Sequence, residues 1–185
     1  MQELLLHSCC APCSAAIVEW MMNNGYTPTV FFSNSNIFPL QEYKHRQSEL
    51  ERFLQEKGLR FVEDDYDHTT WLTEMHGLEE EPEKGQRCTQ CFRFRLLRAA
   101  RYAKANGFSL FATTLASSRW KNIDQVNAAG QWAAEQVGGV EFWARNWRKG
   151  GLQDRRNELL RQYAFYNQQY CGCEFSQRIK PSLQE

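Results

Sequence analysis

The sequence predicts a single α/β domain over residues 1–185, with a parallel, Rossmann-like or HUP-like sheet covered by helices on both faces. Short apolar runs alternate with longer segments of helical periodicity, which is the pattern of β-α units. A chain of 185 residues suits one hydrophobic core, and no internal repeat, linker or low-complexity tract interrupts it. Ligands of such sheets bind beyond the carboxyl ends of the strands, so we expect the functional site there.

The expected strands are short apolar runs bounded by turn residues, such as the three leucines at residues 4–6. They lie at residues 3–7, 26–33, 59–62, 109–113 and 140–143. The expected helices lie between them at residues 14–24, 39–57, 92–106, 122–137 and 154–166. Ser14 is the expected N-cap of the first helix, and Gly25 is its expected stop. The acidic stretch at residues 64–85 predicts a solvated surface segment.

Composition and charge narrow the class of protein. The 22 basic and 22 acidic residues cancel, so the chain lacks the field of a general nucleic-acid coating protein. A local basic patch could still dock a structured RNA. The early apolar run at residues 4–6 is too short for a signal sequence or a membrane span. We therefore expect a cytoplasmic protein with no membrane partner, in a compartment where thiols stay reduced.

Seven cysteines carry the strongest functional signal. They fall into three tight groups, which are Cys9, Cys10 and Cys13, then Cys88 and Cys91, then Cys171 and Cys173. An odd number of cysteines in a reducing compartment argues against a disulfide framework. Scattered core cysteines would not cluster in this way. Metal binding or redox chemistry is therefore the better interpretation.

The first two groups contain C-x-x-C pairs that allow several readings. Cys10 and Cys13, with Cys88 and Cys91, would suit a zinc staple in an RNA-binding module without catalysis. Cys10 and Cys13 alone would suit a thiol–disulfide oxidoreductase. Neither reading explains why Cys9 stands beside Cys10, since adjacent side chains are expected to point apart. Adjacent cysteines can bind different irons of a cluster, so an iron–sulfur site is the leading hypothesis and the other two remain open. Its four ligands would be Cys9, Cys10, Cys88 and Cys91.

The remaining polar candidates are weaker. Cys171 and Cys173 are either two thiols that close the fold or a redox pair or extra metal contact, because the glycine between them lets both sulfurs turn to one side. His7 ends an apolar strand and is expected to be a hydrogen-bonded core residue, whereas His68 is expected at the surface. Four arginines could form a solvated helix face or bind RNA phosphates. They are Arg93, Arg95, Arg98 and Arg101.

Several motifs, taken together, resemble a known family. They are HSCCAPC at residues 7–13, NSNI at 34–37 with Glu42, Tyr43 and Arg46, RCTQC at 87–91 with Arg93 and Arg95, TTL at 113–115 with Ser117 and Ser118, KGGL at 149–152 with Arg155, and YCGC at 170–173 with Phe175. In this order the motifs resemble the QueH family of cobalamin-independent epoxyqueuosine reductases. The resemblance covers nearly the whole chain, with mild departures at Phe92, at Arg119 and Trp120, and at Arg156.

The resemblance implies a tRNA-modifying enzyme that performs the last step of queuosine synthesis. Such an enzyme removes the epoxide oxygen of epoxyqueuosine at the wobble position of tRNA and leaves an alkene. The resemblance also implies a 4Fe–4S cluster on the four ligands named above and an additional mononuclear iron beside it. Cys13 would be a ligand of that second iron.

The implied reaction consumes two electrons and two protons. A cluster passes electrons singly, so an external electron donor, which the sequence does not identify, must refill it. Cys171 and Cys173 would form a redox-active pair able to close a disulfide bond. Tyr43, Tyr170 or a bound water would donate protons, and we take Tyr43 as the catalytic candidate.

Overall fold

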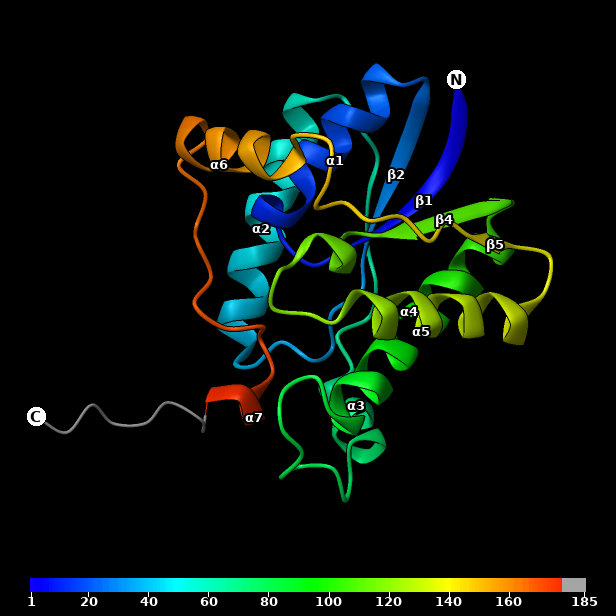
Figure 1. Cartoon of the computed structure of the whole chain (residues 1–185), viewed down its shortest axis with the longest axis vertical. Helices are drawn as coiled ribbons and strands as arrows, with labels where there is room; N and C mark the ends of the chain where they lie inside the picture. The colour runs from blue at the N-terminus through cyan, green and yellow to red at the C-terminus, as the bar shows by residue number, and fades with distance from the viewer. Residues whose placement is uncertain (178–185) are drawn as a thin grey trace, which may run out of the picture.

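The computed structural model describes residues 1–177, and its central feature is a parallel sheet between two layers of helices (Figure 1). The strands are β1 (Gln2–Ser8), β2 (Tyr26–Phe32), β3 (Phe61–Glu63), β4 (Leu110–Thr113) and β5 (Glu141–Phe142). They pair in the order β3-β2-β1-β4-β5, and every pair is parallel. This is the order of a doubly wound sheet, whose topological switch point lies between β1 and β4. The predicted α/β class and parallel sheet are confirmed. The predicted single domain of residues 1–185 includes residues 178–185, which lie outside the described residues.

The helices cover both faces of the sheet, as predicted (Figure 1). One layer contains α1 (Ala11–Asn23), α2 (Leu40–Glu56) and α6 (Leu152–Gln162), and the other contains α4 (Gln86–Ala105) and α5 (Ile123–Val137). Two short helices, α3 (His68–Glu74) and α7 (Glu174–Gln177), lie beyond the carboxyl ends of the strands. Within the described residues, no helix combines the length and apolar character that a membrane span requires.

The core follows from a sheet that is covered on both sides. Leu4, Leu5 and Leu6 are all fully buried at consecutive positions of β1, because side chains on both faces of this central strand meet helices. On the α5 side, Gly130 leaves room for an aromatic ring. A Cβ atom there would lie 2.4 Å from Cε1 of Phe142, so only glycine lets α5 approach β5 this closely.

The two helices that carry C-x-x-C cysteines begin earlier than predicted. α1 begins at Ala11 with Cys10 as its N-cap residue, so the prediction of Ser14 as the N-cap is wrong. Pro12 fits the first turn because it needs no hydrogen-bond acceptor there, and the Ser14 hydroxyl donates to the Cys10 carbonyl at 2.6 Å. α4 begins at Gln86 rather than residue 92, which places the second C-x-x-C pair on a helix.

Candidate metal centre

Three cysteines come together at the switch point of the sheet. Cys9 and Cys10 follow β1, Cys13 lies in the first turn of α1, and their sulfur atoms all lie within 4.8 Å of one another. The Cys9 sulfur also lies 3.8 Å from Oγ1 of Thr114, directly after the neighbouring strand β4. A group of three thiols this close could hold a metal ion, and its position confirms the prediction of a site at the carboxyl ends of the strands.

The two adjacent cysteines do not point apart. The sulfur atoms of Cys9 and Cys10 are 3.8 Å from each other, so this premise of the sequence analysis is wrong. The chain turns here from a strand into a helix, and the alternation of side chains along a strand no longer applies. Two thiolates bound to one tetrahedral metal at about 2.3 Å are roughly 3.8 Å apart. The spacing is therefore compatible with a shared ion as well as with separate irons.

Both C-x-x-C pairs lie at helix N-termini. Cys10 and Cys13 are the N-cap and third residue of α1, and Cys88 and Cys91 lie in the first two turns of α4. Residues three apart on a helix share a face, so each pair can present its sulfurs together. The positive end of a helix stabilises a nearby thiolate, and thiolates are the form that binds metal.

A second group of thiols lies beside the short helices α3 and α7. Cys91 and Cys173 are buried with Trp71, Met75 and Phe175 in an apolar cluster that is separate from the main core, and Cys171 packs against its edge. Cys88 is half-buried, and its sulfur accepts a hydrogen bond from the Lys84 amide at 3.3 Å. All seven cysteines are free thiols, so the structure contains no disulfide between Cys171 and Cys173.

The charges of two cations act on thiols of both groups. The charge of Arg95 acts on Cys9 in the first group and on Cys91 in the second. The charge of Lys121 acts on Cys9 and Cys13 and also on Cys171. The groups therefore lie within electrostatic reach of the same positive charges, which favours their ionised forms. The sequence does not single out Lys121, because a single lysine in a loop carries no pattern.

One thiol in each group ionises most easily. Hydrogen bonds from Cys10 and Cys13, aided by nearby cations, hold the pKa of Cys9 well below its usual value. The same contacts and burial raise the pKa of Cys10. For Cys13, the contact with Cys10 lowers the pKa, but the contact with Cys9 and burial outweigh it and bring the pKa to about 11. Cys9 is therefore the thiol of this group that loses its proton first.

The second group repeats this division. A hydrogen bond from Cys173 lowers the pKa of Cys171, and the same contact together with burial raises the pKa of Cys173. Burial raises the pKa of Cys88 to about 11 and also raises that of Cys91. These two thiols are protonated at neutral pH unless a metal displaces the protons.

His7 is a hydrogen-bonded core residue, as predicted. Its Nε2–H donates to the Ser33 carbonyl at 3.0 Å, and its Nδ1 lies 2.8 Å from Oγ1 of Thr113. Burial, and then the charge of Arg95, lower its pKa to about 3, so the ring is neutral and Nδ1 accepts from the threonine hydroxyl. Both ring nitrogens are occupied, so His7 fixes the spacing of β1, β2 and β4 beside the thiols.

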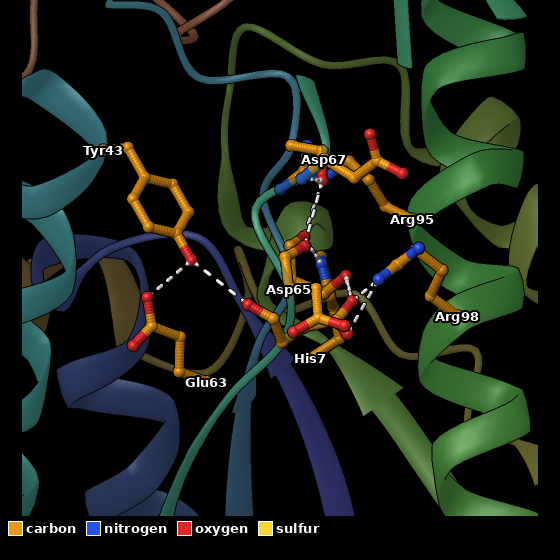
Figure 2. A network of polar contacts seen from close by, with 10 residues as sticks. His7, Tyr43, Glu63, Asp65, Asp67, Arg95 and Arg98 are labelled. Carbon is orange, nitrogen blue, oxygen red and sulfur yellow. Dashed lines mark hydrogen bonds and ion pairs between the residues drawn. The ribbon is translucent and has the colours of Figure 1, made fainter. Parts of the chain in front are cut away.

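The helix that carries the second C-x-x-C pair is bound to the strand ends by arginines. Arg98 extends from α4 toward the strand ends (Figure 2) and donates to the Asp64 carboxylate, with Nε–Oδ2 and Nη2–Oδ1 distances of 2.5 and 2.9 Å. The Ser33 hydroxyl donates to the same carboxylate at 2.6 Å, and Arg95 donates to the Ser33 carbonyl and to the Asn34 side chain. For Arg95 and Arg98, the idea of a solvated helix face is therefore wrong, because the carbonyls and carboxylate at the strand ends require donors.

Tyr43 of α2 is fully buried, and its hydroxyl donates to Oε1 of Glu63, the last residue of β3, at 3.0 Å (Figure 2). The same hydroxyl lies 3.4 Å from the Asp64 carbonyl. Burial, followed by the charge of Glu63, raises its pKa. The hydroxyl of Tyr170 donates instead to the Phe38 carbonyl at 2.7 Å. A catalytic role for Tyr43 as a proton donor stays a prediction.

Arg46 holds the C-terminal cysteine loop in place. Its Nε donates to Glu42 at 2.7 Å, its Nη1 to the Cys171 carbonyl at 3.3 Å and its Nη2 to the Tyr170 carbonyl at 3.1 Å. The Phe38 amide adds a hydrogen bond to the Gly172 carbonyl at 2.9 Å. The motif residues Glu42 and Arg46 therefore position the loop that carries Cys171 and Cys173, a role that only the tertiary contacts reveal.

His68 also differs from its prediction. It is largely buried, with Nδ1 2.7 Å from the Ser35 carbonyl and Nε2 2.8 Å from Glu174. Its ring stacks near those of Tyr66 and Trp71, with centroid distances of 5.9 and 5.4 Å. The surface assignment is wrong because α7 covers this side chain, and no local sequence pattern predicts that cover.

The fold and site together define a class of protein: a doubly wound α/β protein with a multi-cysteine site, suited to metal or redox chemistry, at its switch point. The chain matches the family model described as "Epoxyqueuosine reductase QueH" over residues 4–179. The chain therefore belongs to the QueH family of epoxyqueuosine reductases, oxidoreductases that act in tRNA modification. The family resemblance inferred from the motifs is confirmed.

Individual relatives carry the same description, Epoxyqueuosine reductase QueH. One from Histophilus somni is 47% identical over 176 residues, which span 95% of this chain and 72% of that protein. One from Acinetobacter baylyi is 46% identical over 176 residues, spanning 95% and 81%. One from Thermotoga maritima is 32% identical over 179 residues, spanning 95% and 91%. A solved structure, a predicted tRNA methyltransferase subunit from Methanocaldococcus jannaschii, has a similar fold, with a TM-score of 0.60. The match covers 85% of this chain and 76% of that one at 13% sequence identity, so it supports the fold alone.

Proposed function

We propose that this chain reduces the epoxide of epoxyqueuosine in tRNA with electrons that pass through a 4Fe–4S cluster. The proposed cluster ligands are Cys9, Cys10, Cys88 and Cys91. The observation that carries the proposal is the thiol group at the switch point, with three sulfurs within 4.8 Å of one another in a member of this family. Arg95 supports it, because its charge acts on Cys9 and on Cys91, which are two of the proposed ligands.

Each group of residues has a distinct proposed task. Opening an epoxide to an alkene takes two electrons and two protons and releases the oxygen as water. When bound, an iron–sulfur cluster supplies single electrons and a neighbouring iron supplies a Lewis acid. We assign Cys13 to that second iron, since its sulfur lies beside those of Cys9 and Cys10. The helix N-termini and Lys121 offset the negative charge of several thiolates.

Cys171 and Cys173 are proposed as a redox pair. The interaction with Cys173 lowers the pKa of Cys171, and both thiols belong to the small apolar cluster that contains Cys91. Oxidation of this dithiol to a disulfide would release two electrons and two protons, the number that the epoxide consumes. An external electron donor would then reduce the disulfide for the next cycle.

The proposed partners follow from the reaction. The substrate is tRNA carrying epoxyqueuosine at the wobble position, and tRNA modification of this kind places the enzyme in the cytoplasm. The reducing conditions there keep the thiols available for metal.

The metal is the first point to test. Chain purified without oxygen should show a broad absorbance shoulder near ~400 nm that bleaches on reduction, together with iron and sulfide. It should then convert epoxyqueuosine-containing tRNA. A colourless protein with about one zinc, still colourless after reconstitution with iron and sulfide, would favour the zinc-stapled module instead.

Serine variants separate the readings of the cysteines. Cys9→Ser should lose the absorbance if Cys9 binds the cluster, whereas a zinc staple on the two C-x-x-C pairs would keep its zinc. The double variant of Cys171→Ser and Cys173→Ser should keep the absorbance and lose turnover. Wild-type turnover in this double variant would remove the redox role, and activity without any metal would favour a thiol–disulfide oxidoreductase.

A further inference from the structure

We propose that Trp120, with its neighbours Arg119 and Lys121, is a stacking platform that binds an unpaired nucleotide of the tRNA substrate beside the thiol site. The inference rests on the proposed function and deepens it, because it names where the RNA is held. A stacking site of this kind would place the anticodon loop, which carries the reactive base, next to the cysteines.

The exposure of Trp120 is unusual in this molecule. Its side chain is 67% exposed, and among the large apolar side chains that the structure describes only the N-terminal Met1 is more exposed. An exposed indole offers a large apolar face, and covering that face on binding is favourable. The other tryptophans of the described chain are buried or half-buried, so Trp120 stands apart from the packed core.

The platform lies at the rim of the thiol site. The segment that leads to it begins with Thr114, whose Oγ1 lies 3.8 Å from the Cys9 sulfur, and continues with Ser117, whose hydroxyl donates to the Cys13 carbonyl at 3.3 Å. A nucleotide stacked on Trp120 would therefore sit at the end of the segment that contacts Cys9 and Cys13.

The platform is held rigidly although its tip is exposed. Nη2 of Arg148 donates to the carbonyls of Ser118 and Lys121, the second at 2.6 Å, and so closes the loop from both sides. Nε2 of Gln153 donates to the Ser117 carbonyl at 3.0 Å, and Asn122 caps α5 on the other side. A loop fixed before binding loses little conformational entropy when a ligand arrives.

The chemistry of the platform matches single-stranded RNA. The guanidinium of Arg119 lies 4.9 Å from the centre of the indole ring, where it can share a cation–π contact with a stacked base. Lys121 has no carboxylate partner among residues 1–177, so its ammonium is available for a phosphate. Bases in RNA loops are unstacked and pair their flat faces with aromatic side chains. In a chain of zero formal net charge, this local pair of cations supplies the attraction that the overall charge lacks.

Binding of an anticodon stem-loop RNA, followed by fluorescence anisotropy, tests the platform. We expect Trp120→Ala to weaken binding by roughly 5- to 150-fold, the range found for loss of one base–aromatic stack. Trp120→Phe should retain most of the affinity, because phenylalanine still offers a ring. Lys121→Gln should lower the slope of log affinity against log salt by about one.

Two matched controls should leave binding unchanged. Met22→Ala removes another exposed apolar side chain, 37% exposed, on the far part of α1, and Arg52→Gln removes an exposed cation on α2. Single abasic nucleotides placed along the RNA loop should identify one position at which Trp120→Ala has no further effect. An unchanged affinity of Trp120→Ala, or the absence of any such position, would overturn the stacking assignment.

The same variants distinguish failure of this inference from failure of the proposed function. If the wild type converts epoxyqueuosine-containing tRNA and Trp120→Ala does so with the same KM, the platform is wrong and the proposed function stands. If the wild type neither binds RNA nor turns over, both are wrong. A third outcome is that Trp120→Ala binds RNA normally, turns over slowly with reduced flavodoxin as electron donor, and turns over normally with dithionite. The surface around Trp120 would then dock a protein reductant, which also overturns the proposal.

Discussion

Gly172 shows how one residue can fix the position of two cysteines. Its φ angle is +102°, a conformation that side chains with a Cβ rarely adopt. A Cβ here would lie 2.8 Å from Cγ1 of Ile37 and 3.2 Å from Nη1 of Arg46. The glycine thus lets the backbone between Cys171 and Cys173 pack directly on the loop after β2.

We expect Gly172→Ala to displace this loop and to cost about 1–3 kcal/mol of unfolding free energy, from backbone strain together with the clash. Urea unfolding measures the loss, and the rate at which a thiol reagent labels Cys171 and Cys173 reports the displacement. Gly58→Ala is the matched control, because Gly58 has a φ of +67° and nothing within 4 Å of its Cβ position. Equal effects of the two substitutions would show that the packing against Ile37 and Arg46 contributes nothing.

At the scale of elements, α4 is held to the sheet by polar contacts from Arg95 and Arg98 near its middle and by small apolar residues in its second half. Ala99, Ala100 and Ala103 are fully buried, which allows close packing. Arg98 forms a bidentate ion pair with Asp64, and the two side chains are 26% and 17% exposed. This pair sets the distance between the helix that carries Cys88 and Cys91 and the strand ends that carry Cys9 and Cys10.

A double-mutant cycle of Asp64→Ala and Arg98→Ala should give a coupling energy of about 1–3 kcal/mol, because the pair is bidentate and largely shielded from water. The exposed pair of Lys44 and Glu63, whose side chains are 56% and 34% exposed, should couple by less than about 1 kcal/mol. Urea unfolding of the single and double variants provides both values. We also expect lower iron content in Asp64→Ala; full iron retention would mean that the pair does not position the cysteines.

Glu19 links α1 to two other helices. It accepts hydrogen bonds from Arg155 of α6 at 2.8 Å and from Lys57 after α2 at 3.2 Å. Burial alone would raise its pKa, but the two cations outweigh that effect and hold it below the usual 4.5. A carboxylate with a lowered pKa stabilises the folded chain above its unfolded pKa, and this contribution disappears as pH falls through the folded pKa.

Glu19→Gln should therefore cost about 0.5–1 kcal/mol at pH 7 and almost nothing near pH 3, since partly exposed ion pairs contribute little more. Unfolding of the metal-free wild type and variant at both pH values measures the difference. Glu158→Gln serves as the control, because Glu158 pairs with the same Arg155 but its side chain is 55% exposed. A cost for Glu19→Gln that is independent of pH would mean that packing, rather than charge, links the helices.

At the scale of the whole molecule, cysteines of the candidate site belong to both apolar clusters, because the main cluster includes Cys9 and Cys10, with Cys13 and Cys88 packed against it. The main apolar cluster joins β1, β2, β4 and the two helix layers, whereas the smaller cluster around Trp71 contains three of the cysteines. Metal bound by thiols adds its binding free energy to the elements that carry the ligands.

Removal of metal should therefore loosen the molecule unevenly. Hydrogen exchange should accelerate at the start of α1, at the start of α4 and around residues 171–173, while amides of β1 and β2 keep their protection. Exchange measured on the metal-loaded and metal-free chain tests this. Uniform acceleration across the sheet would show instead that the core depends on the metal.

The sequence by itself determined the α/β class, the approximate positions of the five strands and the family, because apolar runs, glycine stops and cysteine motifs are local patterns. It also predicted His7 as a core residue, since its position at the end of an apolar strand is visible locally.

Only the tertiary structure decided how the site is assembled. The sulfur atoms of Cys9 and Cys10 approach to 3.8 Å because the chain turns there from a strand into a helix. Arg95 and Arg98 face inward because the carbonyl and carboxylate oxygens at the strand ends need hydrogen-bond donors. The helix α7 covers His68. Apart from the contact between Cys9 and Cys10, these contacts join residues far apart in the chain. Their geometry depends on how helices dock on the sheet, and neither periodicity nor motif spacing encodes that docking.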